Sequence, residues 1–516
     1  MADTLHAEAP PAAPAAQAPL TPAEPGALRG DDREYPGYRR PGIRLVEPLD
    51  PLVAAPARPV GISPAAAVHR FDKAHLVMLA EQGIVSAAAA AACLRALLEM
   101  EATGPEGLEA ARAATQAGNH AGEVFLVRRL GMEVGGYIHA GRSSWDLGGI
   151  ANRLPLRGGV LEVMAALNDY RQALLDVAAA HVETVMPYYT HGQHAQPTTL
   201  AHHLHAFVCA AERDFRRLEG AYQTVDVSQA GAAAGTATRF PVSRERTAAL
   251  LGFAAVSTNT RDSSYNQDYI WETAAAVSLV AASLGFLADE LILWCGQEYQ
   301  LIRFADRWCH TSSIMTHKRN PTAAEAVQAV RKRLGGRAPV SYTGPEVREA
   351  MGEVIRALRL LAGIVSTMHV DAAQMRRQAS AYWDQAPDLA AVLVQERGLN
   401  WRMAHQVVGI LVRLAEEAGI APAEATPDLL DRAAVLFLGR PVGLSAAALA
   451  RALDAAACVR TRTATGSPGP DEMRRQIARS RDLLAADRRR VAERHARLDA
   501  ADRALDEAVQ AVVASA

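Results

Sequence analysis

The chain has 516 residues, of which half are hydrophobic and only 5% are aromatic. This length exceeds one ordinary core, so two or three domains are expected, and the abundance of alanine and leucine favours helix over sheet. The net charge of −2, from 54 basic and 56 acidic residues, argues against nucleic acid or an anionic membrane as a partner.

The cysteines and the apolar runs exclude further classes of protein. Five cysteines lie far apart without a CxxC pair, so neither a disulfide framework nor a cysteine metal site is expected, and the predicted location is cytoplasmic. The first ten residues lack a signal-peptide pattern. The longest apolar run, residues 273–288, is shorter than a membrane span and is followed by two acidic residues, so it predicts a buried helix.

The N-terminal third divides into an arm and a helical domain. Residues 1–65 are rich in proline and alanine without periodic apolar positions, which predicts an extended arm. Helical spacing begins near His69 and predicts an N-terminal helical domain over residues 66–150. Glycine and proline at ATGPEG, and again the glycines between residues 131 and 149, predict breaks within that domain.

Three long helical tracts follow and predict a central bundle over residues 151–370. They span residues 155–185, 198–224 and 266–304. In the last tract small residues alternate with leucine and valine around nearly the whole helix, which is typical of burial in a large bundle or an oligomer core. A C-terminal helical domain, residues 371–516, ends in an arginine-rich helix whose basic face is expected in solvent.

Polar residues gather in the loops between these tracts. Pro187 ends one tract and Pro197 precedes the next, which predicts a tight helix-to-helix loop presenting threonine, histidine and glutamine. The stretch CHTSSIMTHKRNP, residues 309–321, is too polar for a core and too apolar for a linker. Taken alone, it is also compatible with an ordinary serine-capped helix start.

Three separated loops together resemble one family. The segment SSIM with the following lysine and Asn-Pro, residues 312–321, resembles the GSSxMPxKxNP motif of the fumarase/aspartase superfamily. HAGRSSWD, residues 139–146, resembles the HTGRSRND segment of its argininosuccinate lyase branch. THGQHAQP, residues 190–197, is similar to that branch's THLQRAQP. The motifs occur in the family's order, and the resemblance extends over about residues 69–485.

The resemblance implies a fold, an assembly and a reaction. An all-α subunit of three domains is expected, whose long central bundle pairs with others into a homotetramer with active sites built from three subunits. The implied reaction is a reversible β-elimination that splits a carbon–nitrogen bond of an N-substituted aspartate and gives fumarate and an amine. The expected partner is therefore a small molecule, and neither a cofactor nor a metal is expected.

The resemblance also assigns roles to particular side chains. Ser312 corresponds to the general base, and Lys318 and Asn320 to groups that bind carboxylate oxygens and stabilise the negatively charged intermediate. His191 is expected near the leaving amine or the second carboxylate, oriented by Glu325. The residues expected to bind substrate are Arg142, Ser143, Ser144, Trp145, Thr190, Gln196, Ser313, Asn320 and Tyr342.

The sequence departs from the family at the amine end of the substrate. Ser144 and Trp145 replace an arginine and an asparagine that contact substrate in argininosuccinate lyases, and an indole offers a single donor. Val347 and Ala350 replace a glutamine and a lysine that hold the amino-acid end of argininosuccinate. These changes predict that the residues for elimination are retained and that the pocket for the leaving amine is altered.

Several alternatives stay open at this stage. The chain is compatible with an authentic argininosuccinate lyase whose pocket has diverged, and with a structural homologue that lacks catalysis. Local misalignment is an alternative explanation for the missing pocket residues. Arg142 as a structural ion-pair residue and Trp145 as a packing residue are further alternatives. Thr311 and Thr316 stand where the family has glycine and proline, which changes the expected hinges of the serine loop.

Overall fold

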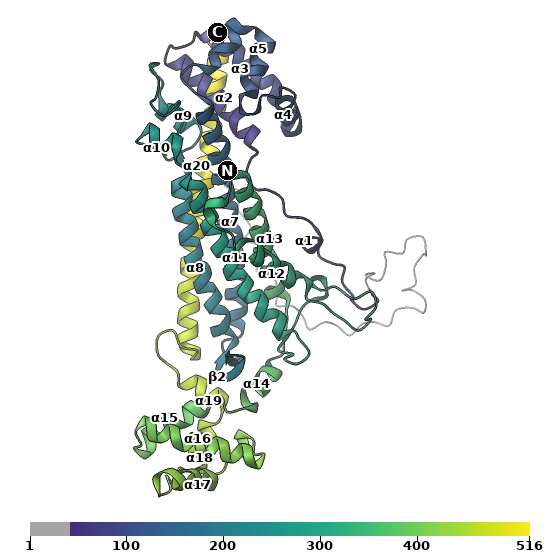
Figure 1. Ribbon diagram of the computed structural model, residues 1–516, viewed down its shortest axis with the longest axis vertical. Coiled ribbons are helices and arrows are strands. Elements are labelled where there is room, and N and C mark those ends of the chain that lie inside the picture. The colour runs from purple at the N-terminus through teal and green to yellow at the C-terminus, as the bar shows by residue number, and fades with distance from the viewer. Residues whose placement is uncertain (1–41) are drawn as a thin grey trace, which may run out of the picture.

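The computed structural model describes residues 42–516, so most of the arm predicted for residues 1–65 lies outside the described part. Figure 1 shows an elongated molecule with a helical unit at one end, long helices through the middle and small helices at the opposite end. The described residues are mostly helical, and their strands form three two-stranded sheets. The expectation of a mostly helical fold is confirmed, although the described chain is not purely α.

The N-terminal unit packs short helices around an apolar core. It contains α2 (Pro64–Glu81), α3 (Ala87–Glu101), α4 (Gly104–Ala113), α5 (Ala121–Leu130) and α6 (Met132–Gly135), with the 3₁₀ turns η3 (Gly118–His120) and η4 (Gly136–His139). Ser63 and Ser86 begin α2 and α3 because their side chains accept hydrogen bonds from first-turn N–H groups. Leu505 and Val509 of the chain's last helix complete this core, so the C-terminal end of α20 packs into the N-terminal unit.

Long helices form the central bundle (Figure 1). They are α7 (Ser144–Ala180), α8 (Leu200–Val225), α11 (Asp268–Trp294), α13 (Gly344–Thr367) and α20 (Pro470–Ala514), with the shorter α12 (Thr322–Leu334) beside them. Each of the three predicted tracts contains a long helix. The first helix begins earlier than predicted because Ser143 and Asp146 form a capping box, which carries α7 through the glycines of the expected break.

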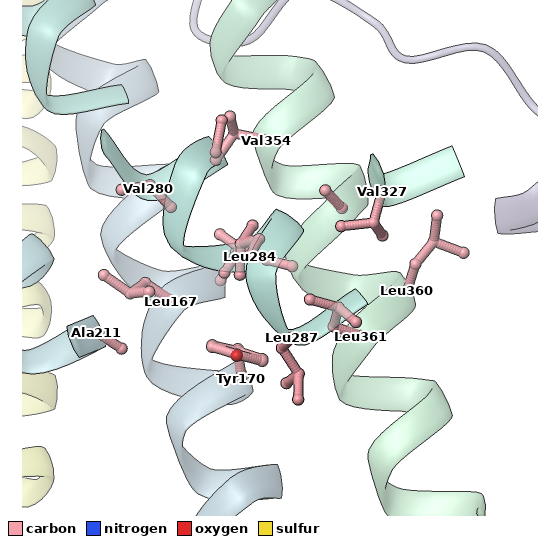
Figure 2. Packing of buried hydrophobic residues seen from close by; sticks show 14 of the residues in the cluster. Leu167, Tyr170, Ala211, Val280, Leu284, Leu287, Val327, Val354, Leu360 and Leu361 are labelled. Atoms are coloured by element: carbon pink, nitrogen blue, oxygen red, sulfur yellow. The ribbon is translucent and has the colours of Figure 1, made fainter. Parts of the chain in front are cut away.

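The core of the bundle lies between α7, α11 and α13. Figure 2 shows Leu284 of α11 among side chains of α7 and α13, including Leu167, Tyr170, Val354 and Leu361. Among the described helices α11 alone has the length and apolar character of a membrane span, and half of that window is buried within the protein. The predicted all-round burial of α11 is therefore achieved only on one side within a single chain.

The segment between Pro187 and Pro197 is a β-hairpin, so the predicted helix-to-helix loop is wrong. Strand β1 (Val185–Thr190) pairs antiparallel with β2 (Gln193–Thr199), and the two prolines lie opposite each other. The connecting residues His191 and Gly192 have φ of 54° and 71°. Two consecutive left-handed residues are typical of a two-residue hairpin turn, which explains the reversal.

The C-terminal unit consists of short helices around its own apolar core. These are α14 (Ala372–Ala381), α15 (Ala386–Arg397), α16 (Trp401–Ala418), α17 (Pro427–Leu438), α18 (Ala446–Ala452) and α19 (Ala455–Thr461), with the 3₁₀ turn η7 (Pro422–Glu424). From there α20 returns along the bundle, with Leu484 and Val491 buried. Its Asp487 forms a buried ion pair with Arg171 of α7 at 2.6 Å. The arginine-rich helix therefore has one packed side and is not merely a solvated tail.

Short elements join the long ones. They are α1 (Pro51–Ala54), α9 (Arg244–Leu250), α10 (Thr260–Tyr265), η5 (Asp306–Trp308), η6 (Pro339–Ser341), the parallel pair β3 (Val227–Ser228) and β4 (Ala255–Val256), and the antiparallel pair β5 (Ile302–Arg303) and β6 (His369–Val370). The segment before α2 is held against α13, because Arg356 donates to the carbonyls of Leu52 and Val53 at 2.8 and 2.7 Å. The last part of the predicted arm therefore lies against α13 and includes the short helix α1.

Candidate active site

The serine loop, residues 311–319, is closed by backbone hydrogen bonds between His310 and Asn320. Ser312 is half-buried within this loop, and its Oγ accepts hydrogen bonds from the backbone N–H of Met315 at 3.0 Å and of Ile314 at 3.4 Å. Ile314 itself is 83% exposed. The loop therefore presents Ser312, Ser313, Lys318 and Asn320 from one short segment that projects from the bundle.

The base of the serine loop is fixed by an aspartate. Asp306 of η5 accepts hydrogen bonds from the Arg319 side chain and, at 2.8 Å, from the backbone N–H of Val46. The side chain of Arg44 donates to the carbonyl of His317 at 3.3 Å. The segment before α2 therefore contacts both the base and the tip of the loop that carries Ser312.

The hairpin carries three of the predicted residues, all of them exposed. Thr190 and His191 lie at the turn, and Gln196 lies opposite Tyr188 further along the strands. Beside them His194 Nδ1 lies 3.1 Å from the buried Asp384. Burial raises the pKa of Asp384, and its hydrogen bond to His194 opposes that shift.

The start of α7 holds the RSSW segment. Ser143 caps the helix, and burial raises the pKa of Asp146 to about 6, against backbone N–H donors such as that of Ser143. Arg142 is buried, and its Nη1 lies 2.8 Å from Asp72, which also pairs with Arg112 at 3.0 Å. These contacts favour the structural ion-pair interpretation of Arg142, and its substrate role stays a prediction.

Two of the predicted substrate-binding side chains stand out, one in this segment and one just before α13. Trp145 is 54% exposed and contacts its surroundings through its backbone, which accepts a hydrogen bond from Gln229 at 2.8 Å. Tyr342 is buried beneath the guanidinium of Arg337, 4.0 Å from the ring centre. Val347 and Ala350 face the core of the bundle, so a pocket for the leaving amine would require other side chains.

The predicted residues fall into groups that one chain keeps apart. Ser143 and the hairpin flank opposite ends of α7, whose 37 residues span about 55 Å at the usual helical rise. His191 and Glu325 are both exposed, and they form no ion pair with each other within residues 42–516. The single chain therefore presents parts of a site at distant places.

Sequence inspection missed two histidine–carboxylate groups. One consists of His120, Glu123 and His139, and the other of His194 and Asp384. Their members come from separate elements, so only the Asn-His pair before α5 and the histidine of the HAGRSS segment could have drawn attention to the first group. The second group has no local signal, because 190 residues separate its members.

Known proteins share extensive sequence similarity with this chain. A protein family described as Lyase matches residues 73–336, and one described as Argininosuccinate lyase C-terminal matches residues 384–460. The argininosuccinate lyase of Methanothermobacter thermautotrophicus is 34% identical over 434 residues, which covers 81% of this chain and 92% of that protein. That of Methanoculleus marisnigri is 37% identical over 434 residues, covering 81% and 87%.

Solved structures share the fold over nearly the whole chain. A crystal structure of EDDS lyase in complex with formate has a TM-score of 0.83 at 29% identity and covers 92% of this chain and 97% of that one. The fold, the motifs and these relatives define a lyase of the fumarase/aspartase superfamily. Within it, the chain belongs to the argininosuccinate lyase family and is a carbon–nitrogen lyase.

Proposed function

We propose that the protein catalyses the reversible β-elimination of an N-substituted aspartate to fumarate and an amine, with Ser312 as the general base. The supporting observation is the serine loop, which holds Ser312, Lys318 and Asn320 within one segment closed by a backbone bridge. Elimination removes a weakly acidic proton beside a carboxylate, and the intermediate carries a second negative charge there. A cation and hydrogen-bond donors at that position lower the barrier.

The loop geometry suits a serine that must lose its proton. Two backbone N–H groups already donate to Ser312 Oγ, and donors to the charged form favour an alkoxide. Lys318 and Asn320 follow on the same loop to bind carboxylate oxygens. In this proposal Thr190 and Gln196 hold the other carboxylate, and His191 lies near the leaving amine with Glu325 orienting it. Closure of the loop excludes water.

The proposed substrate carries an amine other than arginine. Ser144 and Trp145 stand at positions where argininosuccinate lyases have arginine and asparagine, and Trp145 is exposed at the start of α7. The alternative, an authentic argininosuccinate lyase, is favoured by the curated relatives that carry that name. EDDS lyase, a variant of which has been solved with bound fumarate, shares 29% sequence identity with this chain and does not carry the argininosuccinate lyase name.

The proposed assembly is a homotetramer whose sites combine loops from three subunits. The separation of Ser143 from the hairpin along α7 supports this, because a single chain cannot bring the two groups together. Leu279, Phe286 and Leu293 of α11 are each about half exposed in one chain, which supports burial against other subunits. All five cysteines are free, in agreement with a cytoplasmic location. The elimination itself requires no cofactor.

A substrate panel tests the activity. Fumarate release would be measured with argininosuccinate, adenylosuccinate, aspartate and other N-substituted aspartates, and the reverse reaction with fumarate and candidate amines. Turnover of another aspartate derivative without turnover of argininosuccinate is the expected result. Rapid cleavage of argininosuccinate would reject the altered pocket, and no turnover in either direction would favour the structural homologue.

The role of Ser312 is tested by Ser312→Ala. Loss of a general base is expected to lower kcat about 10²- to 10⁴-fold while the oligomer stays intact. Thr316→Ala, an exposed change in the same loop, is the matched control and should retain most of the activity. Unchanged turnover in Ser312→Ala would assign the base to another side chain.

A further inference from the structure

Two histidines and a glutamate converge beside the start of α7. His120 ends η3, Glu123 lies in the first turn of α5 and His139 ends η4. Glu123 Oε2 is 3.2 Å from His120 Nδ1 and 2.9 Å from His139 Nδ1. The two imidazole rings stack with centroids 5.4 Å apart and an interplanar angle of 23°. The three ligand-type atoms therefore all lie within 4.8 Å of one another.

The fold holds this cluster in place. Gly131, with φ of 81°, reverses the chain after α5, and Gly135 then lies against the α5 backbone. A Cβ at Gly135 would lie 2.5 Å from Leu126 C and Val127 N, so only glycine permits this approach. The close contact returns the chain so that His139 reaches the first turn of α5. The cluster is consequently positioned by the backbone and not by the three side chains alone.

Glu123 lacks a permanent cation beside it. Within residues 42–516 its carboxylate contacts the two imidazoles and pairs with no lysine or arginine. The nearby cation Arg142 is already committed to the buried Asp72. The three side chains are between 28% and 40% exposed, so an ion from solvent can reach them. A net negative, accessible and convergent group of this kind attracts a cation.

A fourth residue orients His120. Its Nε2 lies 2.8 Å from Ser144 Oγ, and a proton donated from Nε2 to that hydroxyl leaves the Nδ1 lone pair facing the carboxylate. A lone pair and an anion attract each other only through a cation between them. Such an outer hydrogen bond is the usual way in which proteins orient a metal-binding histidine.

We propose that His120, Glu123 and His139 bind a divalent transition-metal ion of the zinc class. With metal–ligand distances near 2.0–2.1 Å, two ligands of a tetrahedral ion lie roughly 3.3 Å apart, and both contacts of Glu123 are close to that value. Three protein ligands leave a coordination position open, as in catalytic sites. The proposal does not depend on the role of residues 143–145 in substrate binding.

Metal titration of the untagged, full-length protein tests the site. After removal of metals with EDTA, calorimetry with Zn²⁺ should show one equivalent bound per chain, and Co²⁺ should give visible bands of nitrogen and oxygen ligands. Ser144→Ala should weaken binding about tenfold through loss of the outer partner. His139→Ala and Glu123→Gln, which remove ligands, should weaken it more.

Two controls keep the result specific. His405→Ala removes an exposed histidine of α16 and should leave the affinity unchanged. Circular dichroism would establish that each variant is folded. The proposal is overturned if neither Zn²⁺, Co²⁺, Ni²⁺ nor Mn²⁺ binds saturably. It is equally overturned if the variant His120→Ala/His139→Ala binds Zn²⁺ as tightly as the unmodified protein, since the ion would then lie elsewhere.

Discussion

At the scale of single residues, Asp72 is the centre of a buried ion-paired group. Its carboxylate contacts Arg142 at 2.8 Å and Arg112 at 3.0 Å, and all three side chains are almost fully buried. Removing the charge of one member leaves the others unpaired in a medium of low polarity. Asp72→Asn is therefore expected to lower the free energy of unfolding by about 3–5 kcal/mol, measured by denaturant titration.

The carboxylate of Asp72 should also make the free energy of unfolding fall at acidic pH. Burial alone raises the pKa of Asp72, but the charges of Arg142 and Arg112 outweigh it and hold the pKa below its ordinary value. Because the pKa of Asp72 is lower in the folded than in the unfolded chain, where it is about 3.9, its ionised form stabilises the fold at pH values above 3.9. This stabilisation is lost as the pH falls through the pKa of the folded state. In Asp72→Asn this part of the acid dependence should be absent. An identical pH profile in both proteins would contradict the assignment.

Substitution of Trp145 would distinguish a packing residue from a substrate-binding residue. Its side chain is 54% exposed, and its hydrogen bonds come from the backbone. Trp145→Ala is therefore expected to change the free energy of unfolding by less than about 0.5 kcal/mol, yet to change KM for the substrate identified by the panel. A clear loss of stability with unchanged KM would make Trp145 a packing residue.

Site residues were predictable where chemistry is concentrated in a short stretch. Ser312, Lys318 and Asn320 lie within nine residues of sequence, so one motif reveals them together. Arg142 lies within a motif too, but its buried partner Asp72 is 70 residues away and reveals itself only in three dimensions. The cluster of His120, Glu123 and His139 is short in sequence, but its members come from three separate elements, so their proximity is also visible only in three dimensions.

At the scale of elements, the two prolines of the hairpin led to the wrong prediction of a helix-to-helix loop. Prolines at both ends of a polar segment usually mark helix boundaries, whereas here Pro187 and Pro197 pair across β1 and β2. The adjacent His-Gly pair was the better guide, because two left-handed residues form a hairpin turn. The long helices were predictable, since apolar spacing repeats over many turns.

The turn residue Gly192 can be tested by substitution. Its φ is 71°, and no atom lies within 4 Å of an added Cβ, so Gly192→Ala should cost about 1–2 kcal/mol of stability through the backbone alone. Gly409 of α16 has equally open space but a helical backbone. Gly409→Ala should therefore increase stability by about 0.5–1 kcal/mol. Thermal unfolding compares the two, and equal effects would contradict a left-handed turn at Gly192.

At the scale of the whole molecule, the extended shape divides the candidate site. Ser143 lies at the N-terminal end of α7, and the hairpin follows its C-terminal end. Sequence alone indicated the unusual apolar composition of α11 but not which side would stay uncovered. That required the packing of α8, α12 and α13 around α11, which leaves Leu279, Phe286 and Leu293 about half exposed.

The uncovered face of α11 provides the test of assembly. Leu279, Phe286 and Leu293 recur every seven residues, close to two helical turns, so they form one stripe that is 45–55% exposed. Burying an aspartate at a subunit interface costs free energy when no opposite charge faces it. The double variant Leu279→Asp/Leu293→Asp is therefore expected to dissociate the oligomer. Analytical ultracentrifugation would measure the mass. Turnover should fall with it, because a lone chain keeps Ser143 and the hairpin roughly 55 Å apart.

A control on another exposed leucine distinguishes the stripe from general surface effects. Leu436 of α17 is 64% exposed but lies in the C-terminal unit, away from the bundle (Figure 1). Leu436→Asp should leave both mass and turnover unchanged. If the α11 variant dissociates and still turns over substrate at the full rate, each chain holds a complete site and the shared site is wrong. If it stays assembled, the subunits meet through another face, and the half-exposed stripe requires a different explanation.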